Sequence, residues 1–206
     1  MKKKLKNLII CISVIVMFQP MTMSVIAGDE SNPEITDDEN DIIGPRGNIV
    51  TNERYNYLDI VSGWFFEKEN EPDYLFASLK INNYGFRLNP MYFVNFNYGS
   101  YSYDVEFFND ILGILFARAG LVNWTEEPYE IQPISHDVDL RNSIITFKIP
   151  KELIDNPKKD DKITHTYAWT TLQYGFINYY ILKDFYFIWQ DRGPDEGYGK
   201  DYIIQY

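Results

Sequence analysis

The 206-residue chain is acidic and rich in aromatic residues, and both properties limit the kinds of partner and fold that it can have. Its formal net charge of −11 becomes −15 once the four lysines of the first 27 residues are set aside, so we expect neither a nucleic-acid partner nor electrostatic binding to an anionic membrane. Its only cysteine, Cys11, lies in that same segment, which excludes disulfides and thiolate metal sites elsewhere, while 17% aromatic residues favour strands over helices.

Residues 1–27 have the pattern of a secretory signal segment. Basic residues are followed by an apolar run at residues 8–18, and Val-Ile-Ala at residues 25–27 precedes Gly28 at a suitable cleavage position. The apolar run is short for a membrane span of about 20 residues. We therefore expect export and cleavage, which makes the protein secreted or cell-surface. The alternative is an uncleaved anchor, and this segment would then be the only contact with a membrane.

Residues 28–48 are predicted to form a flexible acidic linker. Seven carboxylates lie between Asp29 and Asp41, and a segment this charged and this poor in apolar residues does not usually form a packed core. Residues 49–206 then form a single domain without internal repeats.

Alternating apolar and polar residues predict a series of strands in the first half of that domain. Residues 57–67 and 74–82 form one hairpin, and residues 91–98 and 101–110 form a second that turns at Gly99-Ser100. In the first strand, the even-numbered residues 58–66 are expected to share one face. Residues 111–124 fit a helix or a strand, and a strand is favoured in their first half.

The second half of the domain continues this pattern. Residues 129–140 predict a strand interrupted near Pro133, residues 144–149 a strand that stops at Pro150, and residues 151–155 one helical turn. Two further strands are expected at residues 164–174 and 201–206. The most apolar stretch, residues 178–190, either is buried or presents a patch to a lipid or protein partner.

These eight to ten short strands predict an all-β fold. Their spacing favours an antiparallel β-sandwich of jelly-roll or immunoglobulin-like type.

The order of these features resembles that of secreted prokaryotic, especially archaeal, β-sandwich domains. The chain is similar to DOMON-type and family-9-like carbohydrate-binding modules, and the matching elements are Leu58-Asp59-Ile60-Val61, residues 75–81, 143–150 with 151–157, 166–169 and 194–202. The resemblance implies ligand binding rather than catalysis. It does not extend to haem binding: His136, His165 and Met91 form no recognisable axial-ligand motif, so no haem is expected.

Acidic residues near both ends of the domain are candidate ligands of a structural Ca²⁺. Hard oxygen ligands and neighbouring glycines suit this ion, and the two ends meet if they lie at one end of the sandwich. The candidate metal ligands are Asp41, Asp191, Asp195 and Asp201, with Asp37 close by. The alternative is a solvated acidic loop.

Exposed aromatic side chains beside amides predict a sugar-binding site. The candidate ligand-binding residues are Trp124, Tyr98, Asn95 and Asn97, because sugar rings stack on aromatic faces while amides bond their hydroxyls. Trp64 and Trp169 lie in mid-strand and are expected in the core.

No sequence motif indicates an enzyme. We therefore expect a secreted, non-catalytic ligand-binding domain whose partner is an extracellular glycan. The alternative is a structural or adhesion component of the cell envelope that binds proteins through residues 178–190.

Overall fold

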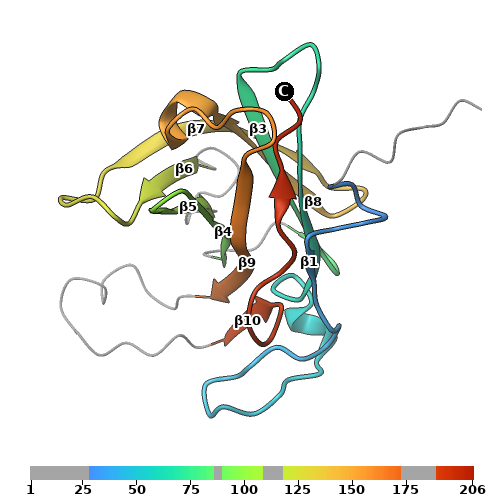
Figure 1. The fold of residues 1–206 in the computed structure, drawn as a ribbon. Coiled ribbons are helices and arrows are strands. Elements are labelled where there is room, and N and C mark those ends of the chain that lie inside the picture. The colour runs from blue at the N-terminus through green and yellow to red at the C-terminus, as the bar shows by residue number, and fades with distance from the viewer. Residues whose placement is uncertain (1–27, 86–89, 109–117, 173–188) are drawn as a thin grey trace, which may run out of the picture.

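The computed structural model describes residues 28–85, 90–108, 118–172 and 189–206 (Figure 1). The predicted signal segment at residues 1–27 lies outside these ranges. So do the first half of the ambiguous stretch 111–124 and all but two residues of the apolar stretch 178–190. No helix within the described ranges is long and apolar enough to cross a membrane.

Strands make up most of the regular structure in the described ranges. They are β1 (Ile35–Thr36), β2 (Ile60–Phe66), β3 (Tyr74–Ile81), β4 (Pro90–Tyr98), β5 (Tyr101–Phe108), β6 (Arg118–Asn123), β7 (Ile131–Asp139), β8 (Ile144–Pro150), β9 (Lys162–Leu172), β10 (Trp189–Gly193) and β11 (Tyr202–Ile203). Two short 3₁₀ helices, η1 (Glu53–Tyr55) and η2 (Lys151–Ile154), join them. The predicted all-β class is confirmed.

The strands form one antiparallel sheet that curves round on itself. Its order is β1-β2-β3-β8-β7-β6-β5-β4-β9-β10, and β11 adds to β9. Strand β7 makes the corner, because it pairs with β6 as far as Ile134 and with β8 from Ser135 onward. The predicted interruption at Pro133 is therefore a change of partner in a continuous strand.

The two ends of the sheet approach each other along a line that we call the seam, where β10 and the loop after it meet β1, β2 and the chain between them. Ile43 and Gln190 exchange two backbone hydrogen bonds of 2.7 and 3.0 Å. Farther along, the Lys200 amide donates to the Glu34 carbonyl over 2.8 Å. These bonds make the sheet a nearly closed barrel, and they place the blue and red ends of the described chain side by side (Figure 1).

Residues 28–48 differ from the flexible linker predicted for them. They contain β1, which pairs with β2, and they bury Ile35 and Ile42 at 0% and 1% exposure. Both isoleucines are buried although each directly follows an acidic residue, Glu34 or Asp41. The average composition of the segment does not reveal two such buried residues.

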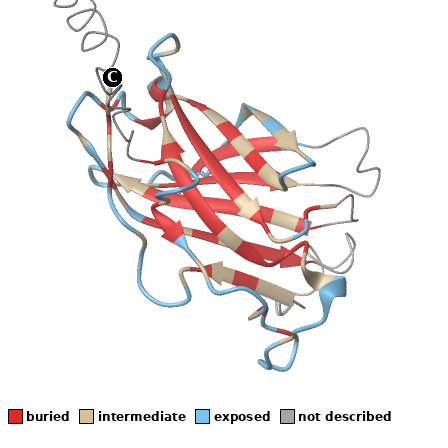
Figure 2. Cartoon of the chain, turned by 90° about the vertical axis from the view of Figure 1, so that its right-hand side faces the viewer, coloured by how far each residue is buried: buried red, intermediate tan, exposed pale blue. Residues whose placement is uncertain are grey.

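The residues of the core cluster alternate along most strands, as predicted. Several strands are nevertheless buried on both faces over four or five consecutive residues, which gives the continuous red stretches of Figure 2. Ile145, Phe147 and Ile149 on β8 are completely buried. Strand β2 departs from the prediction, because a bulge between Ile60 and Ser62 shifts its register and turns Phe65 into the core. The even-numbered residues of this strand therefore do not share one face.

Candidate functional site

A groove of about 450 Å³ opens on the face of the sheet that points away from the core. Strands β4, β5, β9 and β10 build its floor and the end of β6 adds its rim. Its lining residues are Asn95, Ser102, Asp104, Trp124, Tyr167, Trp169, Gln190, Asp191 and Arg192.

Strand alternation explains why polar and aromatic residues gather here. Asn95 lies between core residues Val94 and Phe96, and Asp104 lies between Tyr103 and Val105. Because neighbouring side chains on a strand point to opposite faces, both are directed outward. Asn95 and Asp104 are also direct partners across β4 and β5, so their side chains meet.

Three aromatic side chains border the groove. Trp124 is 47% exposed and its ring centroid lies 4.9 Å from that of Tyr129. Trp169 is half-buried and stacks on Phe93 with the centroids 4.2 Å apart. The Arg192 guanidinium lies 4.8 Å from the centre of the Tyr167 ring, which makes this side of the groove both cationic and aromatic.

The polar side chains of the groove are held by mutual hydrogen bonds. With its amide nitrogen turned toward them, Asn95 donates to the Asp104 carboxylate and to the Tyr167 hydroxyl, the latter over 3.1 Å. The Trp124 side chain also hydrogen-bonds Asp104. Burial raises the pKa of Asp104 to about 6, although the bond with Trp124 lowers it. These contacts fix the positions of an amide, a carboxylate and an indole.

Glu106 is a second buried carboxylate on this face of β5, two residues beyond Asp104. It is 6% exposed, and its Oε1 atom has no hydrogen-bond partner in the described structure. Burial raises its pKa to about 7, with a smaller contribution from the charge of Asp104. This side of the sheet therefore changes charge near neutral pH.

The structure places the four predicted ligand-binding residues in two groups. Trp124 and Asn95 line the groove, whereas Tyr98 and Asn97 are not among its lining residues. The Tyr98 hydroxyl instead donates to Asp161 Oδ2 over 2.7 Å, near the far end of β4. Trp169, expected in the core, lines the groove as well, because its position on β9 faces outward.

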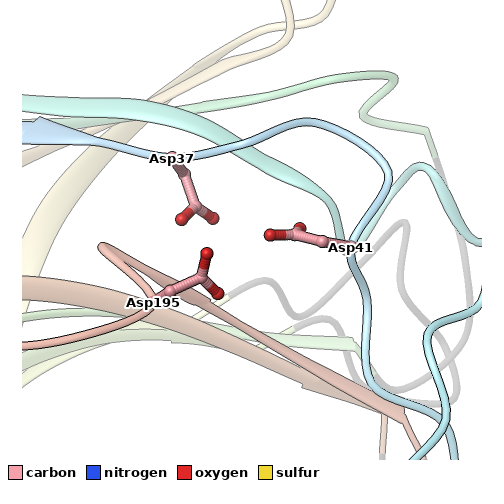
Figure 3. A group of neighbouring side chains, drawn as sticks. All are labelled: Asp37, Asp41 and Asp195. Carbon is pink, nitrogen blue, oxygen red and sulfur yellow. The ribbon is translucent and has the colours of Figure 1, made fainter.

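A second site lies at the seam, where carboxylates from distant parts of the chain converge. Candidate ligand atoms of Asp37, Asp41 and Asp195 lie within 4.8 Å of one another, and Figure 3 shows the three side chains pointing toward a common space. Asp41 also belongs to an overlapping group with Asp59 and Asp191 that has the same spacing. We call these five residues the carboxylate cluster.

Members of the carboxylate cluster differ in whether their oxygens accept hydrogen bonds. Asp59 accepts from the backbone amide of Asn40 at 2.8 Å and from the Asn82 side chain at 2.7 Å. Asp191 accepts from the amide of Ile60. In contrast, both oxygens of Asp37 are enclosed by protein and accept no hydrogen bond from the described residues.

The electrostatics of the cluster oppose ionisation. Burial, followed by the charges of the neighbouring carboxylates, raises the pKa of Asp37 well above its usual range. Burial also raises the pKa values of Asp41 and Asp191. None of the ion pairs within the described ranges involves a cluster member, so these charges have no lysine or arginine partner there.

Three of the four predicted metal ligands are brought together here, namely Asp41, Asp191 and Asp195. Asp201 lies elsewhere, with its carboxylate 3.5 Å from the Lys162 ammonium on the surface. Sequence reasoning missed Asp59, which lies directly before β2 rather than in the two acidic segments considered. Its place between Leu58 and Ile60 was the available signal, because an acid within an apolar strand start needs a local partner.

Comparison with protein-family models, with curated proteins and with solved structures finds no match to this chain.

Proposed function

We propose that this protein is a secreted, non-catalytic domain that binds an extracellular glycan in the groove. One observation carries the proposal: aromatic rings and fixed polar side chains border a single open groove of about 450 Å³. This volume lies within the usual range of small-ligand sites.

The chemistry of the lining suits a sugar. Trp124 and Trp169 offer flat apolar faces against which the C–H side of a pyranose ring packs. Asn95, Asp104 and Gln190 offer amide and carboxylate groups for its hydroxyls. Because hydrogen bonds already hold Asn95 and Asp104 in place, these groups need little reorganisation on binding.

The remaining parts of the proposal concern fold type and location. We propose that the nearly closed sheet is a flattened barrel of the sandwich kind, related to DOMON-type and family-9-like carbohydrate-binding modules. We also propose that residues 1–27 direct export and are removed. The acidic surface then keeps the secreted protein soluble.

A glycan array tests the function directly. The full-length chain is expressed, purified in the form that the host produces, and applied with and without Trp124→Ala. Binding to a defined class of glycans that the substitution weakens supports the proposal. An array without any bound glycan contradicts it, and release of sugar from a bound glycan during long incubation contradicts the non-catalytic part.

A further inference from the structure

The carboxylate cluster concentrates negative charge at the seam, where the two ends of the sheet meet. Asp59 and Asp191 are 0% and 2% exposed. Moving an ion from water into such an environment is costly unless an opposite charge or a proton compensates it. The described lysines and arginines do not provide that charge.

Asp37 supplies an observation that is independent of the clustering itself. Asp37 is only partly buried as a residue, but both of its carboxylate oxygens are shielded from solvent and have no hydrogen-bond partner among the described residues. They point toward Asp41 and Asp195 (Figure 3). Buried polar groups in folded proteins nearly always have a partner. Two enclosed carboxylate oxygens that face two further carboxylates require a positive charge between them, which either protons or a bound cation supplies.

We propose that Asp37, Asp41 and Asp195 bind a Ca²⁺ ion that holds the seam closed. The spacing fits, because an ion with oxygen ligands at 2.3–2.6 Å keeps those oxygens within roughly 5 Å of one another, and the three side chains satisfy this limit. Asp191 and Asp59 flank the site and position Asp41 from the other side.

Ligand chemistry selects calcium among common cations. The cluster offers only oxygen, and no histidine or cysteine belongs to the groups found in the described residues, which disfavours zinc and copper. Several carboxylates from separate loops suit the irregular, high coordination number of Ca²⁺ better than the strict octahedron of Mg²⁺.

The position of the site gives the ion a structural role. Asp37 and Asp41 lie on the segment beside β2, and Asp195 follows β10 across the seam. A Cβ atom added at Gly193 would lie 3.1 Å from Asp37 Cβ and Cγ, so the two sides already meet closely. A bound ion therefore joins the two ends of the sheet and fixes β10, which carries Gln190 and Arg192 into the groove.

Thermal unfolding of the purified protein, stripped with a chelator and returned to CaCl₂ or MgCl₂, tests this inference. At a hundredfold excess over the dissociation constant, we expect CaCl₂ to raise the melting temperature by about 5–10 °C, and MgCl₂ at the same concentration to raise it much less. Calorimetric titration with CaCl₂ measures the dissociation constant.

Two matched variants locate the site. Asp37→Asn keeps the shape of the side chain but replaces a carboxylate that resists ionisation with a neutral amide, so the stripped variant should be at least as stable as the stripped wild type and should gain nothing from CaCl₂. Asp201→Asn, outside the cluster, should keep the full response. A wild type without any CaCl₂ response, an equal response to MgCl₂, or a full response in Asp37→Asn overturns the inference. Glycan binding by the calcium-free protein would leave the proposed function intact, so the two failures are distinguishable.

Discussion

Ile60 and Asp191 are 131 positions apart in the chain, yet the Ile60 amide donates to Asp191 Oδ2 over 2.6 Å. This bond crosses the seam from β2 to β10. The neighbours of Asp191 on β10 are Gln190 and Arg192, which line the groove together with it. The strand that closes the barrel thus also forms one wall of the candidate ligand site, so the stability of the seam and the shape of the groove are linked.

Replacing Trp124 with alanine should weaken glycan binding without unfolding the domain. Trp124 is 47% exposed, so its removal exposes little core, whereas an aromatic anchor in a binding site typically contributes more than about 1 kcal/mol. Calorimetric titration should show at least about a fivefold rise in Kd. Tyr206→Ala, which removes an exposed ring outside the groove, is the matched control and should bind normally. Equal affinities for the two variants would argue against the groove.

Replacing Gly199 with alanine should loosen the seam. A Cβ atom there would lie 2.3 Å from the Glu34 carbonyl oxygen and 2.7 Å from Thr166 Oγ1, so the loop that carries Gly199 would have to move away from Glu34 and from β9. Overpacking of this kind costs about 1–3 kcal/mol, measurable by urea unfolding. Gly85→Ala, where the added atom meets none of the described residues within 4 Å, should be nearly neutral. A stable Gly199→Ala would mean that the loop before β11 does not hold the seam.

Replacing Lys151 with methionine should destabilise the fold strongly. Its ammonium lies 2.5 Å from Glu67 Oε1, and both side chains are almost completely buried. Removing one partner leaves a buried charge without compensation, which costs about 3–5 kcal/mol. The exposed pair of Lys162 and Asp201 provides the comparison, since Lys162→Met should change the free energy of unfolding by less than about 1 kcal/mol. Similar losses in both variants would contradict the importance of burial.

Much of this fold could be predicted from alternation alone. The structure contains the predicted strand at residues 144–149, its end at Pro150 and the helical turn that follows. The strand was predictable because Ile145, Phe147 and Ile149 form an apolar face that packs on only one side of a sheet. The tight turn at Gly99 was also readable, since its positive φ of 57° suits glycine.

The candidate sites were only partly readable, for physical reasons. Asn95 faces Asp104 because of the register in which β4 and β5 pair. Composition alone does not determine this register, nor which outward-facing side chains are buried by their neighbours. Asp59 joins Asp191 only because the ends of the sheet meet, a contact over more than a hundred residues that no local pattern encodes. Residues 28–48 are ordered because two isoleucines are buried, and the average composition of the segment does not reveal them.

Glu106 should make the stability of the domain depend on pH. Its pKa is raised by burial from an ordinary value of 4.5 to about 7, so the folded protein binds this proton more tightly than the unfolded chain. The associated stability is therefore complete below pH 4.5 and is lost as the pH rises through about 7, with a slope of at most about 1.4 kcal/mol per pH unit.

Comparing Glu106→Gln with the wild type between pH 5 and pH 8, at fixed CaCl₂, isolates this contribution. The variant should lose less stability over that interval, because its amide does not titrate. Parallel stability curves for the two proteins would show that Glu106 is not responsible.

A crystal structure of the protein with its strongest array glycan tests the central claim most directly. The account predicts a sugar ring stacked on Trp124 or Trp169, with its hydroxyls bonded to Asn95 and Asp104. A glycan bound on another surface, with the groove filled only by solvent, would contradict it.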